Sequence, residues 1–259
     1  MYTLGSLAML DAPSVTLVGS RRATAYGERI ARALGVAFAR AGVAVISGLA
    51  YGIDVAAQRA ALDAGGRVCA VLGTGLDVFY PVAHRQVQRT IAQRGLVLSE
   101  YTAGTTARPW HFPQRNRLMA ALGQATIVIE AGATSGALLT AEIALGLGRA
   151  VGAVPGNIDS PESRGTNGLL HRTDIAPVTD VASALALLGV APVARRIDLQ
   201  PDEEILWRAL PATSVDDLVA RTLLPTPRCL AALASLELAQ ALTVGYDGTI
   251  RRGAIDDIS

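Results

Sequence analysis

The sequence predicts an α/β protein: a doubly wound, mainly parallel sheet followed by a small C-terminal domain of the winged-helix type. Two observations predict the sheet. Short apolar strands alternate with helices through residues 1–190, and glycine-rich loops follow most of these strands. A third observation predicts the smaller domain, because a proline-bounded segment at residues 191–201 precedes three short helices and a hairpin over residues 202–255. We therefore expect two domains joined by a linker.

Six strands and the helices between them follow in order along the first domain. The expected strands cover residues 15–19, 43–47, 67–72, 96–98, 125–129 and 150–154. The expected helices cover residues 26–41, 53–64, 83–94, 116–122 and 138–147. In the first helix, Ile30, Leu34 and Phe38 recur with helical spacing. Strands that are apolar throughout are typical of a sheet covered on both faces.

The second domain has a different order of elements. Helices are expected at residues 203–209, 215–221 and 227–238, and a hairpin at 242–251 that turns at Asp247-Gly248. Three helices followed by a hairpin is the winged-helix order.

Composition narrows the class of protein. Hydrophobic residues make up 51% of the 259 residues, which supplies a core and excludes a disordered chain. No apolar run reaches the ~18 residues of a membrane span, and residues 1–10 lack the basic start of a secretory signal. Cys69 and Cys229 lie far apart and form no metal motif. We expect a cytoplasmic protein without membrane contact, metal or cofactor.

Arginine supplies all 23 basic residues, so any side-chain cation that meets a phosphate must be a guanidinium group. The charge is divided unevenly along the chain. Residues 1–190 carry 16 Arg and 12 acidic residues, whereas residues 191–259 carry 7 Arg and 10 acidic residues. A polyanion is therefore expected to meet the first domain.

The loops after the strands carry the candidate site, because ligands of a doubly wound sheet bind beyond the carboxyl ends of its strands. Gly19, Ser20, Arg21 and Arg22 follow the first strand and lead into a helix, a setting that favours an anion. The same residues also fit a sharp turn with two solvated arginines. The dinucleotide fingerprint and its acidic partner are both missing, which argues against an NAD enzyme.

Five more loops of this kind follow, and together they predict a broad surface rich in backbone groups. They contain Gly48 and Gly52, then Gly73 and Gly75, then Phe112 and Asn116, then Ser135 and Gly136, and finally Gly156. Six arginines lie on or near these loops: Arg21, Arg22, Arg85, Arg108, Arg115 and Arg117. A rim of arginines fits a ligand with several phosphates better than a single small molecule.

In this order the loop motifs resemble those of the DNA processing protein A (DprA/Smf) family. The motifs are Gly19-Ser20-Arg21, the loop 47–54, Gly73-x-Gly75-x-Asp77, Tyr80-Pro81, Ser99-Glu100, Phe112-Pro113-x-Arg115-Asn116-Arg117, Glu130-Ala131, the segment 135–141 and Pro155-Gly156. The resemblance covers about residues 14–180, and the acidic C-terminal segment resembles the winged helix of that family.

The resemblance implies a Rossmann-like fold and single-stranded DNA as the ligand. It further implies a homodimer that protects incoming DNA and loads RecA onto it during natural transformation and recombination, without enzymatic activity. Arg21, Arg85 and Arg108 are the residues it implies as phosphate contacts. The full expected DNA-binding set is Gly19, Ser20, Arg21, Arg22, Gly48, Gly52, Arg85, Arg108, Phe112, Arg115, Asn116, Arg117, Ser135, Gly136 and Gly156.

The sequence departs from the family pattern at four places. Gln58 stands where a histidine is usual, His84 where an asparagine is usual, and Thr173-Asp174 where a Gly-Ala pair is usual. Only about 14 residues precede the first expected strand, so the family's common N-terminal helical domain is missing from the sequence. The first two departures weaken a catalytic interpretation.

The alternative from another class is an enzyme, a Rossmann-like nucleotide phosphoribohydrolase. Asp54, Asp77, Glu100 and Glu130 end or follow strands, where carboxylates either face a cleft or cap helices. His111 stands between Trp110 and Phe112, where it either stacks on a base or packs internally. The loop from Gly132 lacks the Pro-Gly-Gly lead of those hydrolases, so we favour DNA binding.

The C-terminal domain is a weak candidate for DNA contact. Its net charge of −3 disfavours phosphate, and its helix 227–238 offers only Arg228. We expect a protein contact or an autoinhibitory role for it. Arg251 and Arg252 at the wing leave DNA contact as the alternative.

Overall fold

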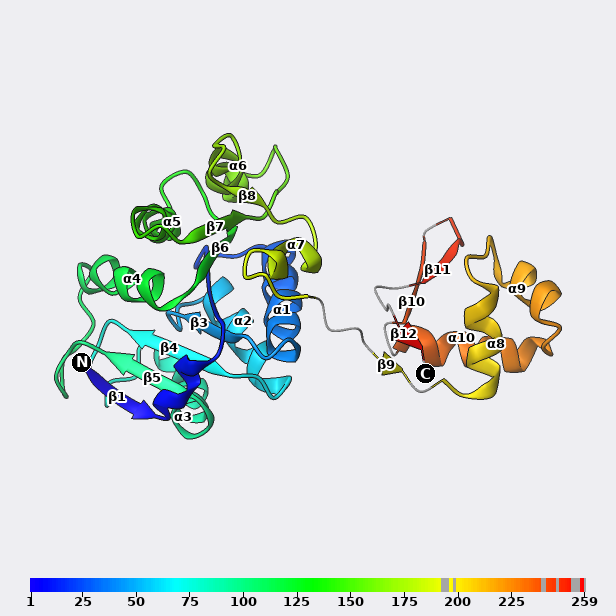
Figure 1. Ribbon diagram of the computed structural model, residues 1–259, viewed down its shortest axis with the longest axis horizontal. Coiled ribbons are helices and arrows are strands. Elements are labelled where there is room, and N and C mark those ends of the chain that lie inside the picture. The colour runs from blue at the N-terminus through cyan, green and yellow to red at the C-terminus, as the bar shows by residue number, and fades with distance from the viewer. Residues whose placement is uncertain (192–195, 198, 239–240, 246, 253–256, 259) are drawn as a thin grey trace. The chain divides into compact units, whose positions relative to one another are not determined.

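The computed structural model describes residues 1–259 apart from 192–195, 198, 239–240, 246, 253–256 and 259 (Figure 1). The chain divides into two compact units, Met1–Val193 and Ala194–Ser259, each with its own hydrophobic core. Residues 192–195 and 198 of the expected linker, and residues 239–240, 246 and 253–255 of the expected second domain, lie outside the described residues.

An eight-stranded sheet forms the centre of the first unit, in the order β1-β5-β4-β3-β2-β6-β7-β8. Its strands are β1 (Tyr2–Gly5), β2 (Ser14–Gly19), β3 (Ala44–Ser47), β4 (Val68–Leu72), β5 (Leu96–Ser99), β6 (Ala125–Glu130), β7 (Ala150–Ala153) and β8 (Ala176–Pro177). β1 pairs antiparallel with β5, and the other pairs are parallel. The six expected strands are confirmed, but the expected strand number is wrong, because β1 and β8 extend the two edges of the sheet.

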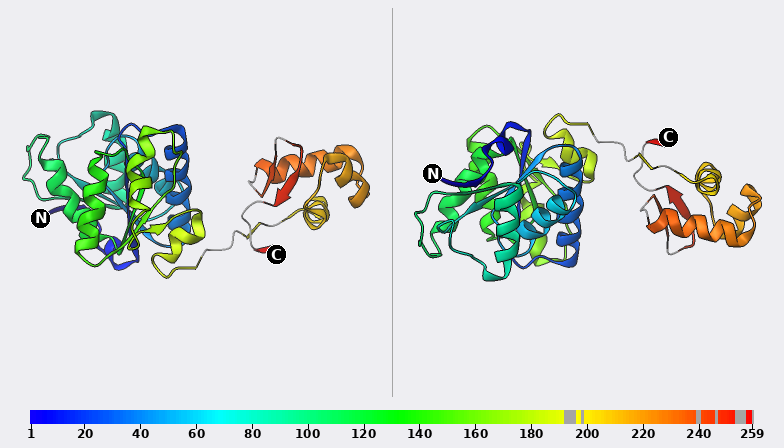
Figure 2. Two further views of the ribbon diagram at one scale, coloured as in Figure 1. Left: turned by 90° about the horizontal axis from the view of Figure 1, so that it is seen from above. Right: turned by 90° about the horizontal axis from the view of Figure 1, so that it is seen from below.

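Helices cover both faces of this sheet (Figure 2). One face carries α1 (Ala25–Arg40), α2 (Ile53–Asp63), α3 (Arg85–Arg94) and α7 (Val181–Ala186), and the other carries α4 (His111–Leu122), α5 (Gly136–Gly146) and α6 (Arg164–Leu169). Three short 3₁₀ turns also occur, η1 (Leu7–Asp11), η2 (Val82–His84) and η3 (Pro161–Ser163). Neighbouring residues such as Val45 and Ile46 belong to opposite cores, as the two-residue period of a strand requires. Across the described ranges we find no helix with both the length and the apolar character needed to cross a membrane.

Helix α4 begins at His111, and the expectation of a loop up to Asn116 is wrong. Pro113 explains the difference, because it occupies the first turn of the helix, where its missing N–H has no intrahelical partner to lose. Consequently Phe112 and Arg115 are presented by a helix and not by a loop.

The strand order reverses next to β2. From β2 the chain adds β3, β4 and β5 on one side, and it then returns to add β6, β7 and β8 on the other. The loops that follow β2 and β6 therefore diverge at the carboxyl edge of the sheet. Such a topological switch point leaves a crevice in which ligands of doubly wound sheets bind.

The second unit contains three helices and a hairpin, as expected. The helices are α8 (Pro201–Ala209), α9 (Val215–Thr222) and α10 (Thr226–Leu238), and the hairpin consists of β10 (Leu242–Val244) and β11 (Ile250–Arg252). A short parallel pair, β9 (Arg196–Ile197) and β12 (Asp257–Ile258), completes it. Leu206, Trp207, Leu218 and Leu236 are buried in its core.

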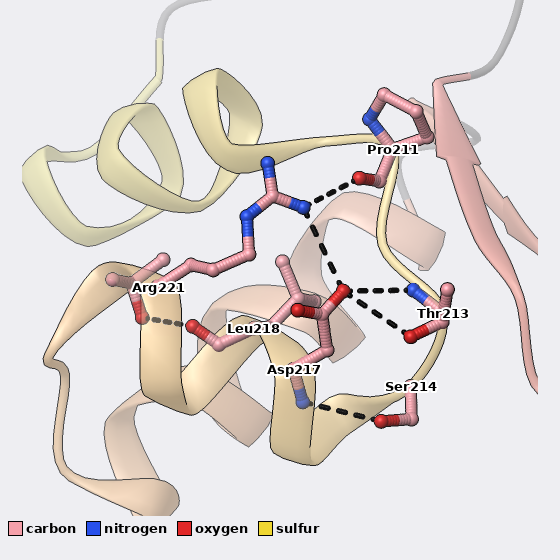
Figure 3. A network of polar contacts seen from close by, with 7 residues as sticks. Pro211, Thr213, Ser214, Asp217, Leu218 and Arg221 are labelled. Atoms are coloured by element: carbon pink, nitrogen blue, oxygen red, sulfur yellow. Dashed lines mark hydrogen bonds and ion pairs between the residues drawn. The ribbon is translucent and has the colours of Figure 1, made fainter.

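A polar network holds the start of α9 (Figure 3). Ser214 Oγ accepts a hydrogen bond from the backbone N–H of Asp217 at 3.1 Å, and the Asp217 carboxylate accepts one from the backbone N–H of Thr213 at 3.0 Å. Arg221 donates to the carbonyl of Pro211 at 2.7 Å and lies 3.6 Å from Asp217. The bond from Thr213 and the charge of Arg221 lower the pKa of Asp217 below its ordinary value. Arg221 is thus engaged in the fold of its own unit.

Candidate nucleic-acid interface

A cleft of about 810 Å³ opens at the carboxyl edge of the sheet in the first unit. Most of its lining comes from the loop after β2, the segment leading into α4, the loop between β6 and α5, and the start of α6. Ala50, Asp54 and Tyr80 add to it from the loop after β3, the start of α2 and the loop after β4. The expected DNA-binding residues that line it are Gly19, Ser20, Arg21, Arg22, Arg108, Phe112, Arg115, Asn116, Ser135 and Gly136. Residues from loops far apart in the sequence therefore converge on one surface.

The loop after β2 is held by hydrogen bonds to Glu130, the last residue of β6. The Glu130 carboxylate is buried and accepts hydrogen bonds from the backbone N–H of Thr24 at 2.8 Å and from its hydroxyl at 2.5 Å. Thr24 in turn caps α1 by accepting a bond from the backbone N–H of Gly27. The backbone N–H of Ser20 donates to the Glu130 carbonyl at 2.7 Å. This loop is therefore anchored at both ends, with Arg21 between the anchors.

Arginine and aromatic side chains lie together in and beside the cleft. The Arg21 guanidinium lies 4.8 Å from the centre of the Phe112 ring, and Tyr80 lies 5.5 Å from the same ring. Arg108 lies 5.5 Å from the ring centre of Trp110. Tyr80 and Trp110 are 45% and 55% exposed, so part of each side chain is accessible to a ligand. Cations beside accessible aromatic side chains suit phosphates and unpaired bases together.

The N-terminus of α5 closes another side of the cleft. Ser135 is the N-cap and accepts a hydrogen bond from the backbone N–H of Ala137 at 3.3 Å. Asn116 is nearly buried, and its side chain donates to the carbonyl of Gly136 at 3.2 Å, which ties α4 to this loop. The first turn of α5 contains no acidic residue, so its N–H groups favour an anion.

Arg115 is placed differently from the other arginines of the cleft. It is only 3% exposed, and its Nη1 donates to the carbonyls of Gly48, at 2.8 Å, and of Val71. Burial lowers its pKa to about 10, although the nearby Asp54 carboxylate opposes that shift. Arg115 therefore remains charged at neutral pH. Burial also raises the pKa of Asp54, against the opposing charge of Arg115.

Five expected residues do not line the cleft. Arg85 is exposed on α3, 4.8 Å from the Phe79 ring, and Arg117 forms an ion pair with Glu100 at 2.5 Å. Gly156 exchanges hydrogen bonds with the side chain of Asn167. Gly48 and Gly52 lie in the loop between β3 and α2, behind the loop that carries Arg21.

The lining also contains residues outside the expected set, among them the acidic Asp54 and Glu162. Thr134 and Arg164 line it, and so does Tyr80. Tyr80 belongs to the Tyr80-Pro81 motif, which is visible in the sequence. Arg164 follows a 3₁₀ turn and not a strand, so a search of strand ends does not reach it.

The carboxylates considered as catalytic candidates are engaged in the fold. Asp54 accepts bonds from the backbone N–H groups of Gly48 and Ala50, and Asp77 accepts from that of Gly104. Glu100 pairs with Arg117, and Glu130 holds Thr24. Within the described ranges, no group of three or more His, Cys, Asp and Glu side chains is arranged to hold a metal ion.

His111 packs inside the protein, which is one of its two expected roles. It is 7% exposed, its ring stacks on Tyr101 at 4.0 Å, and its Nδ1 lies 2.9 Å from the carbonyl of Gly73. A carbonyl only accepts, so Nδ1 carries the proton. Of the two neighbouring aromatic side chains, Trp110 is the exposed one, at 55%.

Comparison with known proteins decides the family. The family model of DNA recombination-mediator protein A matches residues 1–188, and that of the DprA winged helix domain matches residues 190–245. The chain belongs to the DNA recombination-mediator protein A family. The resemblance drawn from the loop motifs and the expected fold class, a doubly wound α/β domain followed by a winged helix, are thereby confirmed.

Members of the DNA recombination-mediator protein A family share much of this sequence and fold. A relative from Mycobacterium tuberculosis, a DprA protein by name, is 40% identical over 253 residues, which is 92% of this chain and 65% of that protein. The crystal structure of DNA processing protein A from Streptococcus pneumoniae is 42% identical with a TM-score of 0.68, and the match covers 71% of this chain and 64% of that one. A structure of DNA processing protein A from Helicobacter pylori, whose description concerns a single-stranded DNA binding mode, is 32% identical with a TM-score of 0.66. The match covers 72% of this chain and 85% of that one. The chain thus spans about two thirds of the length of the first two.

Proposed function

We propose that this chain binds single-stranded DNA in the cleft and loads RecA onto that DNA during natural transformation and recombination. One observation carries the DNA-binding part. Arg21, Arg108 and Arg164 meet the N-terminus of α5 in a single cleft at the carboxyl edge of the sheet. Guanidinium groups and helix N–H groups both bind phosphate, so the cleft suits a polyanion. The description of the Helicobacter pylori relative supports the same ligand.

Single strands suit the cleft better than duplex DNA. The exposed side chains of Tyr80, in the cleft, and of Trp110, beside it, offer aromatic surface for stacking, which only an unpaired base can use. Arginine and backbone groups lining the cleft contact phosphates and carry little sequence information. The expected binding is therefore weakly dependent on sequence and strongly dependent on salt.

Binding without catalysis is the activity that the geometry favours. The four carboxylates that end or follow strands each accept hydrogen bonds or pair with an arginine within the fold. A phosphoribohydrolase needs an acidic group directed at its substrate. Asp54 and Glu162 line the cleft, but Asp54 is bonded to the loop after β3 and Glu162 accepts a hydrogen bond from the Ser160 hydroxyl. Release of free base from a nucleoside monophosphate would contradict this part of the proposal.

The finer parts of the function rest on the family to which the chain belongs. We propose a homodimer that protects incoming DNA in the cytoplasm and has RecA as its partner. A dimer would bring two clefts to one strand, which raises the effective affinity without new contacts.

A gel-shift series tests the DNA-binding part. The chain is titrated against single- and double-stranded DNA of graded length, at two salt concentrations. We expect tighter binding to the single strand, and a log–log salt slope of about −0.7 per phosphate contacted. Equal affinity for single strand and duplex at moderate salt would contradict the proposal.

A separate assay tests the RecA part. RecA ATPase activity is measured on single-stranded DNA coated with single-strand binding protein, with and without the chain. We expect faster onset of ATP hydrolysis with the chain present. An unchanged onset, in a preparation that binds single-stranded DNA, would contradict RecA loading and leave DNA binding intact.

A further inference from the structure

Leu49 adopts a backbone conformation that leucine rarely takes. Its φ is 56°, in the left-handed region, and its side chain is fully buried. Such a conformation is unfavourable for a residue with a side chain and persists only where the surrounding structure enforces it. The loop between β3 and α2 therefore needs external support at this point.

Three buried side chains supply that support. Asp54 Oδ2 accepts hydrogen bonds from the backbone N–H of Gly48 at 3.1 Å and of Ala50 at 3.4 Å, one on each side of Leu49. Arg115 donates to the Gly48 carbonyl at 2.8 Å, and His84 Nδ1 donates to the Leu49 carbonyl at 2.9 Å. The three side chains are 5%, 3% and 5% exposed and come from α2, α4 and η2.

The Gly48–Gly52 loop, which these side chains hold, contacts the residue before Arg21. Gly52 has a φ of 71°, and a side chain at that position would overlap the carbonyl of Ser20. The backbone N–H of Ile53 donates to the same Ser20 carbonyl at 3.2 Å. The position of the Gly48–Gly52 loop is thus transmitted to the residue that precedes Arg21.

We propose that Asp54, His84 and Arg115 are positioning residues, which fix the loop around Leu49 and thereby hold Arg21 at its place in the cleft. Asp54 and Arg115 border the cleft, but all three side chains are buried and bonded to the loop. The inference deepens the proposed function and rests on it. It also assigns Arg115 a task other than direct phosphate contact.

His84 gives the sharpest test, because its removal leaves the buried charges of Asp54 and Arg115 in place. The amide nitrogen of asparagine occupies nearly the position of a histidine Nδ1, so H84N keeps the donor to Leu49 and H84A loses it. We expect H84A to weaken single-stranded DNA binding about tenfold. The affinity of H84N is expected to stay within about threefold of that of the parent. The small loss would come from the ring contact between His84 and Tyr51, which asparagine cannot make.

A double-mutant cycle separates positioning from direct contact. If His84 acts through Arg21, H84A has no further effect on affinity in an R21A background. The same comparison applies to R115K, which keeps a cation but loses the guanidinium fork. Equal affinity of H84A and the parent, or an undiminished loss in the R21A background, would overturn the proposal.

Gly52→Ala tests the same link from the other end and keeps the buried cluster intact. It presses on the Ser20 carbonyl and is expected to weaken binding about tenfold, again only when Arg21 is present. A Gly52→Ala protein that binds like the parent would overturn the link between the two loops even if H84A failed to fold.

Hydrogen exchange provides a readout that needs no DNA. Backbone amides in residues 19–24 are expected to exchange faster in H84A than in the parent, and as slowly as the parent in H84N. Unchanged exchange in H84A would contradict the inference. A parent that does not bind single-stranded DNA, with the exchange pattern as expected, would contradict the proposed function and leave the clamp standing.

Discussion

The guanidinium group of Arg21 lies over the ring of Phe112, 4.8 Å from its centre. Arg21 comes from the loop after β2 and Phe112 from the first turn of α4, so two segments distant in the sequence form one contact. A cation this close to an aromatic ring is attracted by the ring's electron-rich face, which helps to hold Arg21 in the cleft. A guanidinium group held in this way can still contact phosphate through its N–H groups.

Removal of this cation is expected to weaken DNA binding strongly. Arg21→Ala should cost roughly 1.5–3 kcal/mol of binding free energy, as the loss of a charge-assisted hydrogen bond does. The fold should persist, because the side chain is exposed. Fluorescence anisotropy with labelled single-stranded DNA measures the affinity, and circular dichroism checks the fold.

Arg117→Ala is the matched control for Arg21. Arg117 is also exposed and belongs to the expected set, but it pairs with Glu100 and does not line the cleft. Its removal should leave the affinity within about twofold, in keeping with the small net contribution of an exposed ion pair. Arg21→Lys should recover only part of the loss, because the fork is absent. Equal losses for the two alanine variants would place the phosphate site elsewhere.

Phe112 is expected to contribute through its ring. Phe112→Leu keeps an apolar side chain but removes the face that Arg21 and Tyr80 contact. Binding should weaken by about 1–2 kcal/mol, the range of a cation–π contact that is partly desolvated. Phe79→Leu is the control, since Phe79 lies beside Arg85 and outside the cleft. A larger loss for Phe79→Leu would contradict the assigned surface.

Arg164 is expected to be a phosphate contact on the α6 side of the cleft. Arg164→Ala should weaken binding by up to about tenfold and reduce the salt slope by about 0.7, the share of one phosphate on a single strand. Arg149→Ala serves as control, because Arg149 lies outside the cleft and donates to the carbonyl of Ala121. A salt slope that does not change in Arg164→Ala would exclude Arg164 from the phosphate contacts.

Glu130 is expected to act on stability through Thr24. Glu130→Gln exchanges one acceptor oxygen for a donor, so one of the two bonds to Thr24 is lost in a buried place. The free energy of unfolding should fall by about 1.5–3 kcal/mol, measured by urea denaturation. Glu142→Gln, at an exposed ion pair with Arg172, should cost under about 1 kcal/mol. Equal costs would show that the Thr24 contact adds no stability.

Burial explains which parts of the fold the sequence could predict. The central strands were predictable because each is a continuous apolar run between glycine-rich turns. β1 was not, because all four of its residues are exposed at the sheet edge and show no buried pattern. The start of α4 was missed because proline usually marks a loop, whereas Pro113 occupies the permitted first turn.

The location of the candidate site could be predicted from the sequence, but the partners of its side chains could be predicted less well. Parallel strands bring their carboxyl ends to one edge, so Gly19 and Ser135 could be expected near each other. The burial of Arg115 depends on carbonyls from the loop after β3 and from β4, and a sequence pattern carries no information on such partners. The left-handed Leu49 is likewise a product of tertiary contacts and not of local preference.

The C-terminal unit is expected to be dispensable for primary DNA binding. Residues 191–259 hold 7 Arg and 10 acidic residues, a net charge of −3, and several of these arginines are engaged within the unit. Arg228 pairs with Asp202 at 2.5 Å, and Arg252 donates to the carbonyl of Trp207 at 3.1 Å. The exposed part of α10 presents Leu230 and Leu238, which suit a protein partner better than phosphate.

The fragment 1–190 should fold alone, because the sheet and its helices carry both of their hydrophobic cores within it. It should bind single-stranded DNA at least as tightly as the full chain, since a negatively charged neighbour has been removed. That difference should shrink as salt rises, because charges are screened within about 10 Å at 0.1 M. A folded fragment that loses more than about tenfold in affinity, or 1.4 kcal/mol, would show that the winged helix contacts DNA, and Arg251→Ala in the full chain would then locate that contact on the wing.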